Sequence, residues 1–499
     1  MEPSATTQSH ILALPTEILC LIFWLACRPT RSPLEHLEEK KLSDTEVQIS
    51  HVCRYWRSTS LNYSRLWATI AYDKNHVKIS DEKVLSHFKT YLRRAAGHLL
   101  DARFAFLEFY REDIGQNMLE LLLENSSTCH RIFIYAPIDL CRSEFLTRFQ
   151  EIRAPHLASY EVMFFDRSRG GPLRPRQSNP TCSLLGTPKL THLSFQPMAF
   201  VSSIPCSPHI TTIHIEGKFL RYTWTTLLTL LRLPCLRSLS IIYGVFLPPT
   251  GEQGVIERIF APELVQFRCF SEPVVTRILH LLQAPKLDVL VLKGGDMPCF
   301  PSSQSLTRTL SLRDELEAFP VIFPSLRTLV LLDFTCDPSD SEAELKPRVL
   351  RFLAHATRSI TNLYISDFMG NLLRSIVKVD GDGSQIWPNL ELFAVDTHLD
   401  CGRYLPPQFK VFLARRSGAL PPSFKLAISR SAAAAWRVQD AISWSAIVES
   451  GYYHQSSPRK LISDISLSFN ADGIFCETHC PFSPIMIGEE EDISRYLLE

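Results

Sequence analysis

The sequence predicts an α+β, multi-domain chain, in which a small bundle of three helices precedes an irregular α/β solenoid with a parallel, concave sheet. Three observations predict this fold class. A strand-like motif recurs nine times between Ala154 and Val395, segments with helical apolar spacing separate several of its copies, and short apolar helical segments without the motif precede it. The length of 499 residues also exceeds what one hydrophobic core usually fills.

The first predicted helix lies in the apolar segment ILALPTEILCLIFWLAC, Ile11 to Cys27. Its ten consecutive apolar residues, 18–27, are too few for a membrane-spanning helix, which needs roughly 20. No Lys or Arg precedes them, which argues against a signal peptide. Pro15 suits a first helical position and Glu17 a first turn. The helix is apolar almost all round, so we expect burial on more than one side, by the bundle and by a partner. We assign one stripe to Ile18, Leu19, Ile22, Phe23 and Ala26.

Two further helices are expected before residue 72. Ser43 or Asp44 can cap the second, in which apolar residues from Val47 to Trp56 recur at roughly helical spacing. A third segment, 58–70, supplies Leu61, Leu66, Trp67 and Ile70 to close a core. The proline-bearing and charged residues 28–44 form a surface loop in this interpretation.

The order of three short motifs resembles an F-box. Leu14-Pro15-Thr16-Glu17-Ile18-Leu19 with Ile22-Phe23, then Val52-Cys53-Arg54-Tyr55-Trp56-Arg57, then Leu66-Trp67, follow the pattern LPxEIL…IF, VCRxWR and LW. The resemblance covers residues 10–72 and departs from the shorter pattern in the length of the 28–44 loop. It implies docking on the Skp adaptor of a cullin-RING ubiquitin ligase. The alternative is that the same residues form only the core of a free-standing domain. The residues that the resemblance assigns to the adaptor are Leu14, Pro15, Glu17, Ile18, Leu19, Ile22, Phe23, Val52, Cys53 and Trp56.

A repeated strand motif dominates the rest of the chain. It reads Pro, one residue, apolar, two residues, apolar, one residue, apolar, as in APHLASYEV, with unequal intervals between copies. The final alternation buries two side chains on one side of a strand, and segments such as TWTTLLTLLR and RVLRFLAHAT have helical spacing. The array resembles divergent leucine-rich repeats without their usual Asn. The buried triplets of the copies are Leu157, Tyr160, Val162; Leu190, Leu193, Phe195; Ile210, Ile213, Ile215; Leu236, Leu239, Ile241; Leu264, Phe267, Cys269; Leu287, Leu290, Leu292; Leu326, Leu329, Leu331; Ile360, Leu363, Ile365; and Leu390, Phe393, Val395.

We place the solenoid at 85–470 and a tail at 471–499. Residues 85–150 begin the array atypically, with two helix-then-strand pairs, and a last strand is expected around Ile462. An F-box followed by such an array is similar to the F-box proteins of mushroom-forming fungi (basidiomycetes). Strand residues between the buried positions are expected to face solvent on the concave side, where a target would bind, although each is equally well an ordinary solvated residue. These are Glu161, Ser194, His214, Glu216, Ser240, Arg268, Lys293, Tyr364 and Asp396.

Other candidate sites have plainer explanations. CETHC, from Cys476 to Cys480, lacks the second ligand pair of a zinc site. The calcium-like stretch from Asp380 to Glu391 has Gln385 where Gly is required. The arginine-rich loop 166–177 is most simply exposed, although it could grip an acidic partner. No phosphate-binding loop, dinucleotide fingerprint or nucleophile elbow occurs in the sequence, so we expect no enzyme, cofactor or metal.

Composition favours an intracellular protein, cytoplasmic or nuclear. Lys and Arg total 52 and so do Asp and Glu, which is not the footprint of a nucleic-acid-binding protein. We expect neither nucleic acid nor a membrane as a partner. The leading hypothesis is a substrate-receptor subunit that binds the Skp adaptor and an unknown target protein. The alternatives are a non-degradative interaction scaffold built on the repeats and, less favoured, a catalytic repeat protein.

Overall fold

A computed structural model provides the structure of the chain. It describes residues 14–27, 45–73, 81–106, 112–137, 152–165, 186–195, 207–216, 221–242, 245–247, 258–269, 281–293, 323–332, 347–366, 372–373, 375–377, 386–396, 405–416, 421, 423–428 and 430–455. They fall into two compact units, which divide between Ile210 and Thr211. Each unit is described by itself below.

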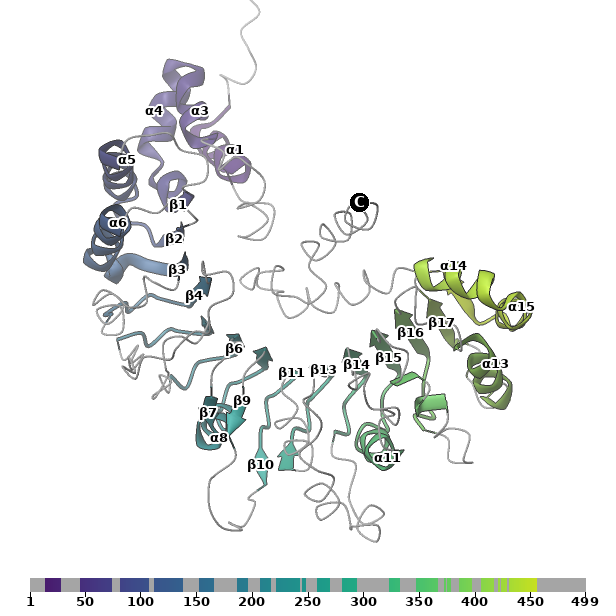
Figure 1. Ribbon diagram of the computed structural model, residues 1–499. Helices are drawn as coiled ribbons and strands as arrows, with labels where there is room; N and C mark the ends of the chain where they lie inside the picture. The colour runs from purple at the N-terminus through teal and green to yellow at the C-terminus, as the bar shows by residue number, and fades with distance from the viewer. Residues whose placement is uncertain are drawn as a thin grey trace, which may run out of the picture. The chain divides into compact units, whose positions relative to one another are not determined.

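Unit 1 begins with helices and continues with strands (Figure 1). Helices α1, α3 and α4 and the short 3-10 helix η2 precede the first strand, and α5 and α6 alternate with the strands that follow. The bounds are α1 Thr16–Cys27, α3 Thr45–Val52, α4 Arg54–Asn62, η2 Ser64–Trp67, β1 Thr69–Asp73, α5 Asp81–Arg94, β2 Leu100–Ala105, α6 Glu112–Glu124, η4 Ser126–Thr128, β3 Cys129–Pro137, β4 Ser159–Phe165 and β5 His192–Phe195.

Unit 2 continues the strand pattern with helices at some of the returns. Its main strands are β6 Thr212–Glu216, β8 Ser238–Ile242, β11 Gln266–Cys269, β13 Val289–Lys293, β14 Thr328–Leu332, β15 Asn362–Ser366, β16 Leu392–Asp396, β17 Lys425–Ile428 and β18 Tyr453–Gln455. Its helices are α8 Trp224–Leu231, α11 Pro347–Ala356, α13 Leu405–Arg416, α14 Arg430–Gln439 and α15 Ala441–Glu449. The short strands β7 Arg221–Thr223 and β9 Val245–Leu247 pair with each other, as do β10 Ile259–Phe260 and β12 Leu282–Gln283.

The main strands form one 14-stranded sheet in the order β1-β2-β3-β4-β5-β6-β8-β11-β13-β14-β15-β16-β17-β18. Spatial order follows chain order, and neighbouring strands pair in parallel, for example Phe267 with Leu290 and Leu329 with Leu363. A parallel pair requires a crossover between its strands, so each repeat adds one strand and one return. The fold is therefore α+β with a long parallel sheet and a solenoid-like organisation, as the sequence predicted. Each of the nine motif copies supplies a strand.

In eight of the nine motif copies a proline lies in the turn that precedes the strand. In the first copy the N–H of Leu157 donates to the carbonyl of Ala154 over 3.0 Å, which places Pro155 second in a four-residue turn. Proline favours that position because its ring fixes φ near the value the turn needs. The same bond joins Leu190 to Thr187 and Leu287 to Ala284, each over 3.1 Å. The turn then directs the first apolar side chain of the triplet into the core.

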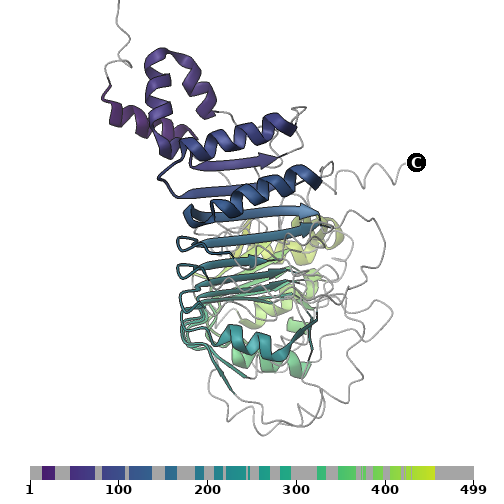
Figure 2. The same ribbon diagram turned by 90° about the vertical axis from the view of Figure 1, so that its left-hand side faces the viewer.

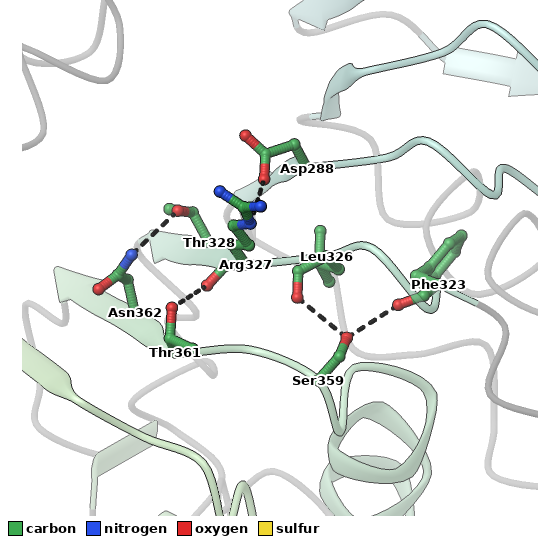
Figure 3. A network of polar contacts seen from close by, with 8 residues as sticks. All are labelled: Asp288, Phe323, Leu326, Arg327, Thr328, Ser359, Thr361 and Asn362. Atoms are coloured by element: carbon green, nitrogen blue, oxygen red, sulfur yellow. Dashed lines mark hydrogen bonds and ion pairs between the residues drawn. The ribbon is translucent and has the colours of Figure 1, made fainter.

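Hydrogen bonds between successive turns align the repeats. The N–H of Arg327 donates to the carbonyl of Asp288 over 3.1 Å, and that of Thr361 donates to the carbonyl of Arg327 over 2.9 Å. Side chains add to this ladder (Figure 3): Ser359 Oγ donates to the carbonyls of Phe323 and Leu326, each over 2.9 Å. Each turn is thus bonded to the next, which fixes the register of the strands.

One face of the sheet is covered by helices, and we call it the helix face. In unit 1 the Phe104 ring of β2 lies 5.6 Å from Phe88 of α5, and Figure 2 views this unit from the side of α5 and α6. In unit 2 the Phe393 ring of β16 lies 5.6 Å from both Phe409 and Phe412 of α13. The motif triplets point to this face and are buried wherever their side chains are described. Alternation in a strand places the residues between them on the other side, the opposite face.

The N-terminal bundle differs from the sequence prediction in two places. The second expected helix is two helices, because Cys53 adopts an extended conformation (φ −156°, ψ 173°) between α3 and α4. The third expected helix is wrong: 58–70 forms the end of α4, the turn η2 and the start of β1, so Ile70 belongs to the sheet. The expected strand at Ile462, the CETHC stretch, the arginine-rich loop and Asp380 to Gln385 lie outside the described residues.

Candidate functional site

Helix α1 has one buried and one exposed apolar side. Leu19 and Phe23 are 0% and 1% exposed, and the Phe23 ring meets the Trp56 ring edge-on at 4.9 Å. The single stripe expected from the sequence is therefore wrong, since Leu19 and Phe23 support the helix from beneath and do not form its surface. The exposed apolar side chains of α1 are Ile18 (45%), Leu21 (48%), Ile22 (43%) and Leu25 (53%). Their spacing of three, four and seven residues places them on one face of the helix.

The junction between α3 and α4 adds a further apolar side chain. Val52 ends α3 and is 60% exposed. The next residue, Cys53, caps α4, where its Sγ accepts a hydrogen bond from the Trp56 backbone N–H over 3.4 Å. The indole Nε1 of Trp56 is buried and has no hydrogen-bond partner among the described residues. In the folded bundle, apolar side chains of α1 and α3 therefore remain exposed, and the indole N–H of Trp56 donates to no described residue.

The remaining predicted adaptor residues lie at the start of α1. Leu14 is half-buried, whereas Pro15 and Glu17 are exposed. Tyr55 of α4 donates through its hydroxyl to the Leu14 carbonyl over 3.4 Å, and the same hydroxyl lies 3.3 Å from Thr16 Oγ1. These contacts hold the beginning of α1 against α4. We call Leu14, Ile18, Leu21, Ile22, Leu25 and Val52 the bundle surface.

The bundle is fixed to the first helix of the repeats within unit 1. Trp67 is fully buried, donates from its indole Nε1 to the Ser60 carbonyl over 2.8 Å, and packs edge-on against Tyr91 of α5 at 5.1 Å. The Tyr91 hydroxyl also bonds to Glu46 of α3. A ring contact and a polar contact from two elements of the bundle therefore converge on one tyrosine, which makes the bundle and the start of the sheet one packed body.

The register brings the predicted target-binding residues into line. Glu161 pairs with Ser194 in unit 1, while His214 pairs with Ser240 and Ser240 with Arg268 in unit 2. The row continues in unit 2 through Val291 and Val330 to Tyr364. The other three predicted residues lie in a second row, in which Glu216 aligns with Ile242, Lys293 with Leu332 and Asp396 with Ser366. The side chains of Glu216, Lys293 and Asp396 lie outside the described part of the structure. The prediction that the candidates share one face thus agrees with the register.

The expected exposure of these residues is wrong. All six whose side chains are described are buried, between 2% and 8% exposed. The reason is that each lies on a central strand, with a neighbouring strand roughly 4.8 Å away on both sides whose side chains on this face limit the access of water. The six buried candidates are Glu161 (3%), Ser194 (2%), His214 (8%), Ser240 (5%), Arg268 (6%) and Tyr364 (6%).

In unit 2 the opposite face carries an apolar cluster that sequence reasoning missed. Its buried members come from six strands between β8 and β17, with Leu392 packed against them. The missed signal was the continuous apolar run in segments such as VLVL and TLVLL, which is typical of parallel strands buried on both faces. The cluster comprises Ile242, Val289, Val291, Val330, Leu332, Tyr364, Ala394 and Ala427.

In unit 1 the same face carries charged and polar side chains beside apolar ones. Arg103, Phe133, Glu161 and Ser194 are register neighbours across β2, β3, β4 and β5. Burial raises the pKa of Glu161 to about 8, although the positive charge of Arg103 acts in the other direction. Burial also lowers the pKa of Arg103, with the nearby Asp101 opposing that shift. Glu161 Oε1 and Ser194 Oγ are buried without a hydrogen-bond partner among the described residues.

Searches for a known type of site and for relatives gave no assignment. Among the described residues, no three His, Cys, Asp or Glu side chains gather as metal ligands, and no described helix is long and apolar enough to cross a membrane. No protein-family model matches the chain, and no curated protein matches its sequence. The candidate sites are therefore the bundle surface and the opposite face of the sheet.

Proposed function

We propose that this chain is the substrate-receptor subunit of a Skp–cullin–F-box ubiquitin ligase. The bundle surface binds the Skp adaptor, and the opposite face of the sheet binds the target protein. The chain contributes no chemistry of its own and acts by holding the target near a ubiquitin-charged enzyme. The observation that carries the proposal is the exposed apolar stripe of α1, together with Val52, on a bundle whose motifs resemble an F-box.

The exposures give the scale of the interaction. Ile18, Leu21, Ile22, Leu25 and Val52 each keep about half of their area in water. Covering the remaining half of such a side chain contributes roughly 1 kcal/mol, so the five together contribute about 5 kcal/mol. This contribution alone does not give a stable complex, because it must also offset the translational and rotational entropy lost on association. Polar contacts at the start of α1, where Glu17 is exposed, supply more.

Co-purification with a Skp adaptor tests the proposal. The full chain is expressed with the adaptor as wild type, as the double variant Ile18→Asp/Ile22→Asp, and as the control Ile442→Asp. Ile442 lies on α15 in unit 2 and is 79% exposed, so the control introduces a carboxylate at an exposed isoleucine away from the bundle. We expect the double variant to lose adaptor binding by about 100-fold or more, because two carboxylates would be buried without partners.

Equal recovery of the adaptor with all three proteins would contradict the docking role. Loss of recovery with the control as well would show that the effect is not specific to the bundle surface, and would also count against the proposal. Degradation is read separately, from the abundance of proteins captured by the repeats. Their accumulation in cells without this chain is expected of a ligase subunit, whereas unchanged levels would indicate a scaffold.

A further inference from the structure

Two buried oxygen atoms on the opposite face of unit 1 have no partner within the described chain. Glu161 Oε1 on β4 and Ser194 Oγ on β5 belong to side chains 3% and 2% exposed, and the two residues are direct register partners. Buried polar groups in folded proteins are nearly always hydrogen-bonded, so a pair of neighbouring exceptions needs an explanation. One explanation is a ligand that donates hydrogen bonds to these two oxygen atoms.

We propose that this face binds a basic side chain, lysine or arginine, of the target protein, with the Glu161 carboxylate as its counter-ion and the Ser194 hydroxyl as a second acceptor. The inference rests on the proposed function, in which the repeats select a target, and it deepens that function by naming the chemical feature that is recognised. We call Arg103, Phe133, Glu161 and Ser194 the polar row.

The arrangement of the polar row explains why Glu161 is not neutralised internally. The opposite charge that acts on the pKa of Glu161 is that of Arg103, but Arg103 lies two strands away, roughly 10 Å between Cα atoms, with Phe133 on the strand between them. Among the described residues, no ion pair joins the two. Within the described part of unit 1, the Glu161 carboxylate therefore has no ion-pair partner.

The neighbours of Glu161 suit the stem and the head of a long basic side chain. Phe133 and Met163 form a small buried apolar cluster, with Tyr135 packed against it. The (CH₂) stem of Lys or Arg lies favourably along such a surface, and an aromatic ring attracts its cationic head. Both unpaired oxygens accept hydrogen bonds, and a guanidinium or ammonium only donates them.

Proton linkage follows from the same geometry. The pKa of Glu161 is raised to about 8 by burial, so at neutral pH the free site is largely protonated. A cation stabilises the carboxylate, so binding releases this proton, and affinity rises as the pH increases toward about 8.5. Among the described side chains, the other charged or titratable groups on this face of unit 1 are Asp101 and Arg103 on β2, Arg131 and Tyr135 on β3 and His192 on β5. The contribution of Glu161 to the pH dependence is isolated by comparison with Glu161→Gln.

The experiment selects ligands without knowledge of the target. The full chain is panned against a displayed library of random peptides, and the affinities of enriched peptides are measured for wild type, Glu161→Gln, Ser194→Ala and the control Glu263→Gln. Glu263 is an exposed carboxylate of unit 2 that pairs with Lys286 over 2.7 Å, so the control makes the same chemical change away from the site. We expect enriched peptides to share one Lys or Arg, whose replacement by norleucine weakens binding about tenfold or more.

We expect Glu161→Gln to weaken the same peptides by about tenfold to 100-fold and to remove most of the pH dependence between about pH 6.5 and 8.5. Ser194→Ala should weaken peptide binding less than Glu161→Gln does, and Glu263→Gln should leave peptide binding unchanged. The inference is overturned if the library yields no binder, if the binders lack a shared basic residue, or if Glu161→Gln binds them as wild type does. Thermal melting of Glu161→Gln checks its fold, and Ser194→Ala provides a milder variant. Adaptor capture is measured on the same variants, so failure of this inference is distinguishable from failure of the proposed function.

Discussion

Adjacent residues of α1 should respond to mutation in opposite ways. Phe23 is 1% exposed and packs edge-on against Trp56, so Phe23→Ala leaves a cavity that should destabilise the bundle by about 3–5 kcal/mol. Ile22 is 43% exposed, so only about half of its side chain is lost from the core, and Ile22→Ala should destabilise the bundle by about 1 kcal/mol. The difference of about 2–4 kcal/mol is well above experimental error.

Hydrogen exchange measured by mass spectrometry is the suitable assay, because peptides from α1 and α4 report the local unfolding of the bundle and not of the sheet. Adaptor affinity should show the reverse order. Ile22→Ala should weaken binding by about fivefold, because it removes half a buried isoleucine from the interface. The volume-conserving Phe23→Leu, which keeps the core filled, should leave binding nearly unchanged. Equal protection losses for the two alanine variants, or stronger loss of binding for Phe23→Leu than for Ile22→Ala, would refute the assignment of the two sides of α1.

Three further predictions concern the end of helix α13, Gly186 and the buried Glu161 of the sheet. Arg416 is 2% exposed and donates to the backbone carbonyls of Ile386 and Trp387, so Arg416→Met should destabilise the end of α13 by about 2–5 kcal/mol, measured by hydrogen exchange, with little rescue by Arg416→Lys. At Gly186 an added Cβ would lie 2.8 Å from the backbone of Arg153, so Gly186→Ala should lower the urea midpoint by the equivalent of more than about 1 kcal/mol. Burial raises the pKa of Glu161 to about 8, so between about pH 4.5 and 8 the carboxyl is protonated in the native state and ionised in the unfolded chain. The contribution of the protonated carboxyl to the free energy of unfolding is complete below about pH 4.5 and is lost as the pH rises through 8. Glu161→Gln should therefore flatten the fall of melting temperature over this range, and an unchanged slope would contradict the assignment.

The repeats could be predicted from sequence because their information is local. A proline places the turn, the apolar residue that follows turns inward, and the alternation sets the strand. Leu157, Leu236 and Leu326 are all 2% exposed or less, as the pattern requires. Local information was also sufficient for α8 and α11, whose apolar spacing is helical. The order of the strands follows because consecutive elements of a chain usually lie next to each other in the fold.

The bundle was harder to predict because its key features depend on contacts between helices. A helix that is apolar all round does not reveal which side faces its own chain, and only packing against Trp56 distinguishes Phe23 from Ile22. The break at Cys53 was also missed. A thiol is a weak hydrogen-bond acceptor, so it is not among the usual capping residues, yet its Sγ accepts from the N–H of Trp56. Residue type alone does not encode that geometry.

The two units use the opposite face of the sheet differently, and this bears on where a target would be selected. In unit 2 the face holds the polar residues His214, Ser240 and Arg268 together with an apolar cluster that runs from β8 to β17, and the apolar cluster favours apolar partners with little discrimination among them. In unit 1 the polar row favours a partner that donates hydrogen bonds to Glu161 and Ser194, because the desolvation of these two groups has already occurred in the free protein. A correct partner gains hydrogen bonds there, and an incorrect one gains nothing. Under the proposed function, specificity therefore depends on the polar positions of this face, which include Glu161 and Ser194 in unit 1 and Ser240 in unit 2.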